Sequence, residues 1–553
     1  MRIIRQWLTD REGSGGRDIL SLTLLFGIIF FQALGRFPLL DPDEGRYAEI
    51  PREMLERWDF VTPCLNYVKY FEKPPLHYWL NALAMSIFGR NEFSARLPGA
   101  AMGLLTIVVT YHAGRKLYGR RAGVISAVML GTSLGFCALA RLDITDMTLT
   151  CTLSASLIFF MLATREGEKR KGTCYHLGYA CAALAVLAKG LIGLLFPGAI
   201  IFLYLLLTRR WRLLAEMRLA TGIPLFLAVA APWFVLVSLR NPEFARFFFI
   251  HEHFERFTST VHGRFQPFWY FIPVLAGTML PWSLYIPTAL RGRWRDRKTG
   301  TGDSLLYLAI WAVFIFFFFS KSNSKLIPYI LPTFPPLALL AGEKVAAVMD
   351  GEFTPLALPS YLAGGILCLI GGCLALYPHL AGDPLLTGTG GTVIGLLFIV
   401  QGGWAVAAAR KKDVLVLVIG LALCSCLIET AAPPFVLPAL GGWRSSRDMG
   451  LLAARLAPPG ATIASIGLDQ GLSFYARRRI MVIGDPNELE FGSRQGDNSA
   501  WFLDVPRFSR LWHGTAPVYL VISDMELAYL KNIITPPFTV LGRTRRKMLI
   551  TNR

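Results

Sequence analysis

Long apolar blocks separated by short basic clusters run through most of this 553-residue chain. Apolar residues make up 54% of the chain and charged residues only 17%, whereas a soluble chain carries about 25% charged residues. Blocks of about 20 apolar residues are long enough to cross a bilayer as helices. The pattern predicts a polytopic α-helical membrane protein. It excludes a disordered chain, a fibrous repeat and a cytosolic enzyme.

The excess of basic residues gives a net charge of +19, and their placement decides what that charge means. A strongly basic chain can bind nucleic acid. In this chain, however, Lys and Arg lie between apolar blocks, as in the positive-inside pattern that orients membrane helices. The clusters lie near residues 115–121, 165–171, 209–218, 291–298 and 410–412. They predict about thirteen crossings, with membrane lipids and no nucleic acid among the partners.

The same topology divides the chain into two domains. Residues 1–434 form a transmembrane domain with outer juxtamembrane loops at 38–96 and 240–266, and residues 435–553 form a small outer α/β domain. The small domain holds no G-x-G-x-x-G fingerprint, so we expect no nucleotide cofactor. Short apolar runs typical of buried strands occur in it at 461–466, 480–483 and 518–523.

The first outer segment is rich in charge directly after a membrane helix. Its first charged residues are Asp41, Asp43, Glu44 and Arg46. One interpretation is structural: Asp43 caps a helix, Glu44 lies in its first turn, and an apolar stripe follows at helical spacing. The other is functional, because a carboxylate at a membrane exit is well placed to act on a lipid-borne substrate. The stripe consists of Tyr47, Ile50 and Met54.

Further charged residues lie close to the predicted outer ends of crossings. Glu72 and Lys73 precede two prolines, which fits a phosphate and metal site as well as an interfacial anchor. Asp143 and Asp146 lie at the end of the third crossing, and Lys189 lies at the end of the fifth. A charge inside the bilayer is costly. Lys189 therefore has two open interpretations: its side chain extends to the interface by snorkelling, or it has a functional role.

The second outer loop carries two histidines and an arginine, His251, His253 and Arg256. The H-E-x-x-H spacing of metalloproteases is absent, and at most one histidine reaches a site shared with Glu72. An amphipathic surface helix is the alternative. Several cations on the outer side, where Lys and Arg are normally scarce, indicate an anionic substrate in the membrane, such as a lipid phosphate. These cations are Arg46, Lys73, Lys189, Arg256 and Lys325.

Three segments resemble the bacterial aminoarabinose transferase family, whose members are C-type glycosyltransferases related to the protein mannosyltransferases. The segments are Asp43-Glu-Gly-Arg-Tyr-Ala-Glu-Ile-Pro-Arg-Glu-Met, Tyr70-Phe-Glu-Lys-Pro-Pro-Leu and Lys325-Leu-Ile-Pro-Tyr-Ile-Leu. Gly45 departs from the family pattern, in which a bulkier residue is common. The resemblance implies an inverting enzyme of the bacterial inner membrane with its active site facing the periplasm. It would move 4-amino-4-deoxy-L-arabinose from undecaprenyl phosphate to lipid A phosphates, a modification that gives resistance to polymyxin and cationic peptides.

The resemblance also implies roles for single residues. Asp43 would be the carboxylate near the reacting centre, and Asp146 a second essential acid. Glu72 with His251 or His253 would bind a divalent metal such as zinc, and we expect a monomer. The residues implied to hold the undecaprenyl phosphate leaving group are Arg46, Tyr70, Lys73, Lys189, Arg256 and Tyr329.

Two other functions are open at this point. One is the same chemistry with a protein hydroxyl or another envelope glycan as the acceptor. The other is a transporter or flippase for a lipid-linked sugar. Transporters usually place ionisable groups near the bilayer midplane on broken helices, often in matching repeats. In this chain the candidates gather on one predicted face without a visible repeat, which favours a transferase.

Overall fold

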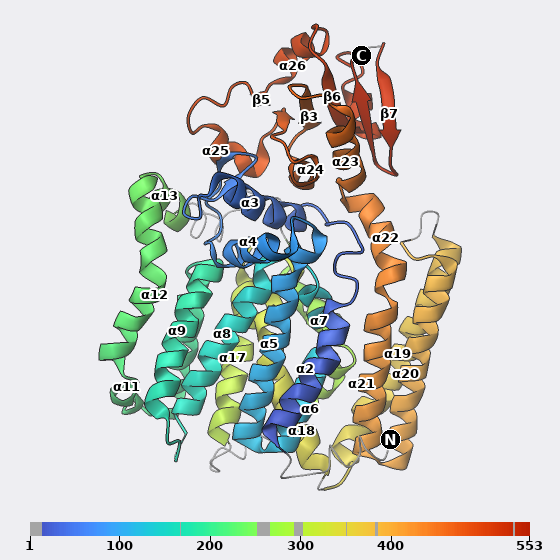
Figure 1. Cartoon of the computed structure of the whole chain (residues 1–553). Helices are drawn as coiled ribbons and strands as arrows, with labels where there is room; N and C mark the ends of the chain where they lie inside the picture. The colour runs from blue at the N-terminus through green and yellow to red at the C-terminus, as the bar shows by residue number, and fades with distance from the viewer. Residues whose placement is uncertain are drawn as a thin grey trace. The chain divides into compact units, whose positions relative to one another are not determined.

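The chain forms two compact units. In the computed structural model the described residues are 14–165, 167–250, 266–291, 302–349, 351–381, 385–534 and 537–553. The first unit, named the helical unit, comprises residues 1–32, 99–236 and 245–435. The second, named the mixed unit, comprises residues 33–98, 237–244 and 436–553. Figure 1 colours both units from blue at the N-terminus to red at the C-terminus.

The helical unit confirms the prediction of a polytopic α-helical membrane protein. Its described elements are α2 (Gly15–Phe31), α5 (Glu92–Tyr118), α6 (Arg120–Gly131), α7 (Leu134–Ala140), α8 (Thr145–Ala163), α9 (Lys171–Lys189), α10 (Ile192–Thr208), α11 (Leu213–Glu216), α12 (Leu219–Arg240), α13 (Phe244–Arg246), η2 (Phe268–Tyr270), α15 (Phe271–Thr278), η3 (Trp282–Tyr285), α16 (Ile286–Leu290), α17 (Gly302–Lys321), η4 (Ile327–Thr333), α18 (Phe334–Met349), α19 (Thr354–Leu380), α20 (Gly388–Lys411) and α21 (Val414–Ala431). Among the described residues, seven helices are long and apolar enough to cross a membrane, or nine if each bent pair is one span. The number of about thirteen crossings stays a prediction.

Two helix pairs of this unit are sharply bent, and their breaks bond to each other. The pair α6 and α7 bends by 67°, and the pair 268–278 and 282–290 bends by 109°. The Trp282 Nε1 donates to Thr132 Oγ1 at 2.9 Å, and the Leu134 backbone N donates to the Leu280 carbonyl at 3.2 Å. In a membrane, polar groups freed at a break need such partners within the protein.

Helices α19 and α20 lie side by side (Figure 1), and glycines set how closely they pack. A Cβ added at Gly371 would lie 2.4 Å from the Gly395 carbonyl oxygen. Small residues let membrane helices approach through their backbones. This hairpin therefore depends on backbone contact at that level.

The mixed unit contains a six-stranded sheet, which confirms the predicted α/β fold of the C-terminal segment. Its strands are β3 (Thr462–Ile466), β4 (Met481–Ile483), β5 (Phe502–Leu503), β6 (Val518–Ser523), β7 (Thr539–Arg543) and β8 (Lys547–Thr551). Their order is β5-β4-β3-β6-β8-β7. The first four are parallel, and β8 is antiparallel to both of its neighbours. The three apolar runs predicted as strands coincide with β3, β4 and β6.

Helices cover both faces of this sheet, as its alternating side chains require. Ile463 and Val521 pack against α23 (Arg447–Leu456) and α24 (Gln470–Ala476) on one face. Ala464 and Leu520 pack against α26 (Val505–Trp512) on the other. The remaining elements of the unit are α3 (Asp43–Arg57), β1 (Cys64–Leu65), β2 (Val68–Lys69), α4 (Leu76–Phe88), α22 (Pro433–Arg444), η5 (Asn487–Leu489), α25 (Glu490–Ser493) and α27 (Asp524–Tyr529).

The start of α3 differs from the predicted one. Pro42 occupies the N-cap position without a side-chain cap bond, and Asp43 is the first helical residue. The prediction that Asp43 caps the helix is wrong, because Asp43 already has a helical position; its carboxylate lies 3.4 Å from Arg46, one turn further along. The predicted apolar stripe is confirmed, since all three of its members are buried in one core. They are Tyr47, Ile50 and Met54.

Candidate functional site

In the helical unit, two predicted site residues meet at the ends of two adjacent helices. Asp146 lies in the first turn of α8, and Lys189 is the last residue of α9. The Lys189 Nζ donates to the Asp146 carboxylate in an ion pair, and both side chains are about nine-tenths buried. A carboxylate is favoured at a helix N-terminus and a cation at a C-terminus, because of the helix dipole. Each charge is therefore stabilised by its own helix as well as by its partner.

Tyr329 completes this group of the helical unit. The Lys189 Nζ lies 4.8 Å from the centroid of the Tyr329 ring, in cation–π geometry. Nearby in sequence, the Lys325 Nζ donates to the backbone carbonyls of Ser322 at 2.5 Å and Gln266 at 2.8 Å. Burial lowers the pKa of Lys325. The described part of this unit thus places a buried cation, a carboxylate and an aromatic ring together.

In the mixed unit, a second group forms around Arg46 on the first turn of α3. The Arg46 Nη2 lies 3.1 Å from the Glu488 carboxylate and 3.4 Å from Asp43. Its Nη1 donates to the Tyr70 hydroxyl at 3.3 Å. Asp43 and Arg46 are three residues apart and share one helix face. The Arg46 side chain is 4% exposed and that of Asp43 is 41% exposed, so a solvent-facing carboxylate sits beside a buried guanidinium.

Burial and neighbouring charge shift the ionisation of this second group. Burial alone would lower the pKa of Arg46, but the charge of Glu488 raises it above its ordinary value. Burial raises the pKa of Glu488 and of the Tyr70 hydroxyl. Gln470 Nε2 donates to Glu488 at 2.9 Å, which holds that carboxylate in place. Arg46 is therefore a permanent cation with an acidic partner.

Glu72 and Lys73 follow Tyr70 directly and lie in the same unit. Both side chains are largely buried, at 8% and 13% exposure, and the Lys73 Nζ is 4.0 Å from the Glu72 carboxylate. It also donates to the Glu72 carbonyl at 2.8 Å. A buried carboxylate next to an ammonium can bind a metal ion, and the ammonium can instead bind an anion.

The predicted site residues thus fall into two groups of three, the adjacent pair Glu72 and Lys73, and one remainder. The structure brings Arg46, Asp43 and Tyr70 together in one unit, and Asp146, Lys189 and Tyr329 together in the other. Sequence analysis missed Glu488 and Gln470, the partners contributed by the C-terminal segment. No local signal marks them, because both are ordinary residues of short helices. The remainder consists of predicted residues that lie outside the described part of the chain, which are His251, His253 and Arg256.

The described residues do not by themselves form a metal site. Within them no group of three His, Cys, Asp or Glu side chains is close enough to hold an ion. Glu72 is the one predicted ligand that the described part contains, and it is buried. A tetrahedral zinc site needs three protein ligands or more.

Two family comparisons match separate parts of the chain. Residues 72–236 match the family described as dolichyl-phosphate-mannose-protein mannosyltransferase. Residues 451–552 match the aminoarabinose transferase C-terminal domain. The second match covers most of the segment that contributes Glu488.

Curated relatives match the chain over most of its length. An undecaprenyl phosphate-alpha-4-amino-4-deoxy-L-arabinose arabinosyl transferase of Aeromonas salmonicida is 34% identical over 495 residues, covering 85% of this chain and 87% of the relative. A relative of the same description from Erwinia tasmaniensis is 30% identical over 539 residues, covering 92% and 94%.

Solved structures give the same result. The crystal structure of ArnT from Cupriavidus metallidurans bound to undecaprenyl phosphate matches with a TM-score of 0.85 at 30% identity, covering 98% of this chain and 99% of that chain. The archaeal oligosaccharyltransferase AglB from Archaeoglobus fulgidus matches with a TM-score of 0.55 at 14% identity, covering 93% and 70%. The second likeness is one of fold alone.

Proposed function

The chain belongs to the aminoarabinose transferase family of C-type glycosyltransferases, and from this premise we propose that it moves 4-amino-4-deoxy-L-arabinose from undecaprenyl phosphate to phosphate groups of lipid A. One observation carries the proposal: the chain matches, over 98% of its length, a structure that holds undecaprenyl phosphate. The buried cations described above have the charge that such a lipid phosphate requires. Arg46 has the planar, bidentate geometry that suits a phosphate.

The proposed transfer is a displacement at the anomeric carbon of the sugar. An oxygen of the acceptor phosphate forms a new bond to that carbon with its electron pair. The bond from the carbon to the donor phosphate oxygen breaks, and its electrons leave with undecaprenyl phosphate. Negative charge therefore grows on the departing phosphate, and preorganised cations are the main electrostatic means of stabilising it. Arg46 and Lys73 in the mixed unit and Lys189 in the helical unit would take this role, with Arg256 and the hydroxyls of Tyr70 and Tyr329.

Asp43 is proposed to position the acceptor or the amino group of the sugar. An acceptor phosphate is already anionic, so it needs no general base, whereas a hydroxyl acceptor would need one. The exposure of the Asp43 carboxylate beside Arg46 supports contact with a substrate. Asp146 would act as the second acid, and its ion pair holds the Lys189 ammonium in place.

A divalent metal is part of the proposal, with Glu72 and either His251 or His253 as ligands. Its support is the buried Glu72 carboxylate, and the transfer steps above need no contribution from it. Near-stoichiometric zinc in the purified chain, lost in Glu72→Ala, would support the metal. Full activity of metal-free protein would refute it.

We further propose that the enzyme is a monomer of the bacterial inner membrane and that its active site faces the periplasm. The apolar helices of the described part support the membrane placement, and the clustering of Lys and Arg between apolar blocks supports the orientation. Cysteine labelling supplies a test. A thiol introduced at an exposed position of the mixed unit should react with an impermeant reagent in intact spheroplasts.

A lipid A mass spectrum tests the transfer itself. The chain is expressed in a host that lacks its own aminoarabinose transferase, and the lipid A is compared with and without it. We expect added aminoarabinose with the wild-type chain and none with Asp43→Asn at equal membrane level. Asp448→Asn is the matched control, because Asp448 is also a solvent-exposed aspartate in the first turn of a helix and has no proposed role in the transfer.

Two results would contradict the proposal in different ways. Unmodified lipid A with wild-type protein in the membrane would exclude this donor and acceptor pair and direct attention to a protein hydroxyl or another envelope glycan. Full modification with Asp43→Asn would leave the transfer intact and exclude the role of Asp43.

A further inference from the structure

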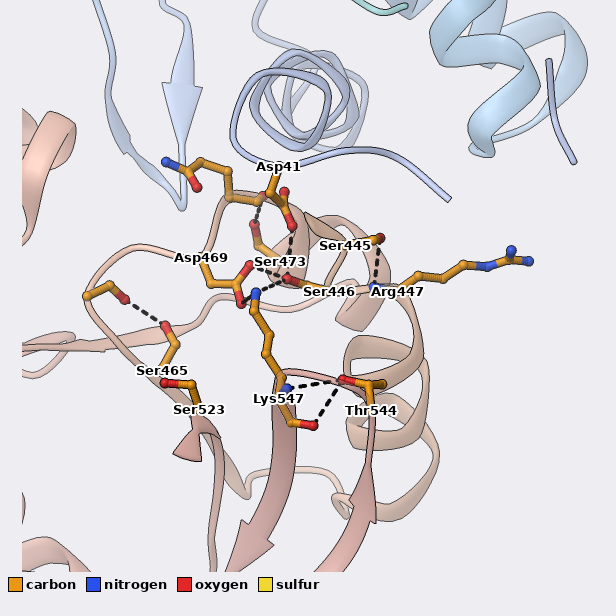
Figure 2. Close-up of polar contacts among 12 residues, drawn as sticks. Asp41, Ser445, Ser446, Arg447, Ser465, Asp469, Ser473, Ser523, Thr544 and Lys547 are labelled. Atoms are coloured by element: carbon orange, nitrogen blue, oxygen red, sulfur yellow. Dashed lines mark hydrogen bonds and ion pairs between the residues drawn. The ribbon is translucent and has the colours of Figure 1, made fainter. Parts of the chain in front are cut away.

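A largely but not fully buried polar cluster at the start of α3 has no part in the transfer described above. It joins Asp41, two residues before Asp43, to three residues of the C-terminal segment: Ser446, Asp469 and Lys547 (Figure 2). The Ser446 Oγ is 2.9 Å from the Asp41 Oδ2 and also bonds to Asp469. The Lys547 Nζ donates to Ser446 at 2.7 Å and to Asp469 at 2.6 Å. Three side chains thus converge on the hydroxyl of Ser446.

The hydrogen count of this cluster requires an extra proton. The Ser446 hydroxyl has one hydrogen and accepts a hydrogen bond from the Lys547 ammonium. It can therefore donate to only one of the two carboxylates that approach it. The other carboxylate can bond to Ser446 only if it is itself protonated. Two carboxylates against one ammonium would also leave a net negative charge in a buried place, which is costly.

Asp41 is the carboxyl that takes this proton. Burial and the charge of Asp469 raise its pKa to about 7, against the opposing effects of Lys547, Ser446 and the Gly471 backbone N–H. Burial lowers the pKa of Lys547, but Asp469 and Asp41 outweigh it and raise the pKa, with a smaller effect of Glu526 on α27.

Other charged groups next to the cluster already have partners. On α3, the Asp43 carboxylate faces Arg46. Glu44 is bound by Arg96 at 2.7 and 2.8 Å. On α23, Arg447 pairs with Glu92 at 3.2 Å. Protonation of Asp41 is therefore the simplest way to balance the cluster.

Asp41 is tied to the first turn of α3 by close packing. Its backbone N donates to the Arg444 carbonyl at 2.6 Å. A Cβ added at Gly45 would lie 2.2 Å from the Asp41 Oδ1 and 2.6 Å from the Gly471 N. The Asp41 carboxyl, the first turn of α3 and the start of α24 are thus in direct contact, and Pro42 limits the backbone freedom between Asp41 and Asp43.

We propose that Asp41, Ser446, Asp469 and Lys547 form a proton-holding latch through which the C-terminal segment fixes the first turn of α3, and with it Asp43 and Arg46. Asp41 is then a positioning residue for donor binding and transfer. Closed, the latch holds a proton on Asp41 and is neutral. When the proton leaves, the buried excess charge loosens the first turn, and the Arg46 guanidinium moves from its place for the donor phosphate. The inference rests on the proposed roles of Asp43 and Arg46.

The test compares Asp41→Ala and Asp41→Asn in the purified full-length chain. Asparagine imitates the protonated carboxyl, since its amide can donate to Ser446 and accept from Gly471. We expect Asp41→Ala to raise the donor KM about tenfold and to lower kcat about tenfold, the scale of a misplaced binding group, and Asp41→Asn to restore both at pH 6. In the wild type the donor KM should rise above about pH 7, as the linkage of proton loss to binding requires, whereas in Asp41→Asn it should stay flat.

These readouts separate positioning from mere stability. Loss of folded enzyme lowers the apparent kcat but leaves KM unchanged. Asp448→Ala, an exposed change on α23, should behave as wild type. A wild-type KM in Asp41→Ala, or identical pH profiles of the wild type and Asp41→Asn, would overturn the latch. If Asp41→Ala fails to fold, the pH profile of Asp41→Asn decides alone.

A second measurement keeps the latch distinguishable from the transfer reaction. If the wild type transfers no aminoarabinose, the proposed function fails, and affinity for undecaprenyl phosphate alone becomes the readout. Asp41→Ala should then bind it about tenfold more weakly, and Asp41→Asn should bind it at pH 8 as tightly as the wild type does at pH 6. Equal affinities of all three proteins between pH 6 and 8 would overturn the latch.

Discussion

Replacing Gly45 by alanine tests how tightly the first turn of α3 is packed. The added methyl would lie 2.2 Å from the Asp41 Oδ1 and 2.6–2.7 Å from the backbone of Gly471. Real Cβ contacts are longer than 3 Å, so either α24 or the Asp41 carboxyl must move. Two of the nearest atoms belong to backbone, which cannot rotate away. Overpacking of this kind costs about 1–3 kcal/mol.

A helix-interior glycine in open space responds in the opposite way. Gly442, near the end of α22 in the same unit, has no atom within 4 Å of an added Cβ. Alanine at such a position usually stabilises a helix by about 0.5–1 kcal/mol. Gly442→Ala is therefore the matched control for Gly45→Ala: the chemical change is the same, and the expected change in stability has the opposite sign.

Thermal unfolding of the purified chain measures the difference. A loss of about 1 kcal/mol lowers the Tm of a domain of about 150–250 residues by about 2–4 °C. We expect Gly45→Ala to melt several degrees below the wild type and Gly442→Ala to melt at or above it. A Gly45→Ala protein as stable as the wild type would refute the packing argument, and with it the tie between Asp41 and α3.

Three further predictions follow from described contacts. Lys189→Met should destabilise the chain by about 3–5 kcal/mol because it leaves Asp146 buried without its cation. Adding Asp146→Asn should restore much of the Tm without restoring transfer. A Lys189→Met protein as stable as the double variant would contradict this. The free energy of unfolding should fall by up to about 4 kcal/mol as pH rises from about 4 to 7. The pKa of Asp41 is raised in the folded chain, so the folded state binds the proton more tightly than the unfolded state does. Denaturant titrations should show a shallower fall in Asp41→Asn. Trp282→Phe should cost about 1 kcal/mol through the lost bond to Thr132, measured as a lower Tm, and an unchanged Tm would show that the bond contributes nothing net.

Local patterns explain why much of the fold was predictable. Apolar runs of membrane length and the short apolar runs near residues 462 and 518 are signals carried by adjacent residues, and the structure confirms the elements predicted from them. The shared helix face of Asp43 and Arg46 follows from a spacing of three residues. The capping prediction failed because the helix begins at Asp43 itself, so that Pro42 and not Asp43 occupies the N-cap position.

Long-range pairing explains what sequence analysis could not predict. Asp146 and Lys189 were each proposed for the site, but their ion pair spans 43 residues and depends on how α8 and α9 pack. The acidic partner of Arg46 comes from the far end of the chain, where no sequence pattern distinguishes the largely buried Glu488 from exposed acids. Charged pairs of this kind are determined by tertiary structure alone.

The two bent helix pairs have a consequence for biosynthesis. Residues 120–140 enter the membrane well before residues 268–290 leave the ribosome, yet the Leu134 N–H and the Leu280 carbonyl satisfy each other, as do the Trp282 indole and the Thr132 hydroxyl. An unsatisfied polar group in hydrocarbon costs several kcal/mol. The first broken helix must therefore wait beside the translocon or a water-filled channel until its partner arrives. A ribosome stalled between the two segments should leave the first one extractable from the bilayer.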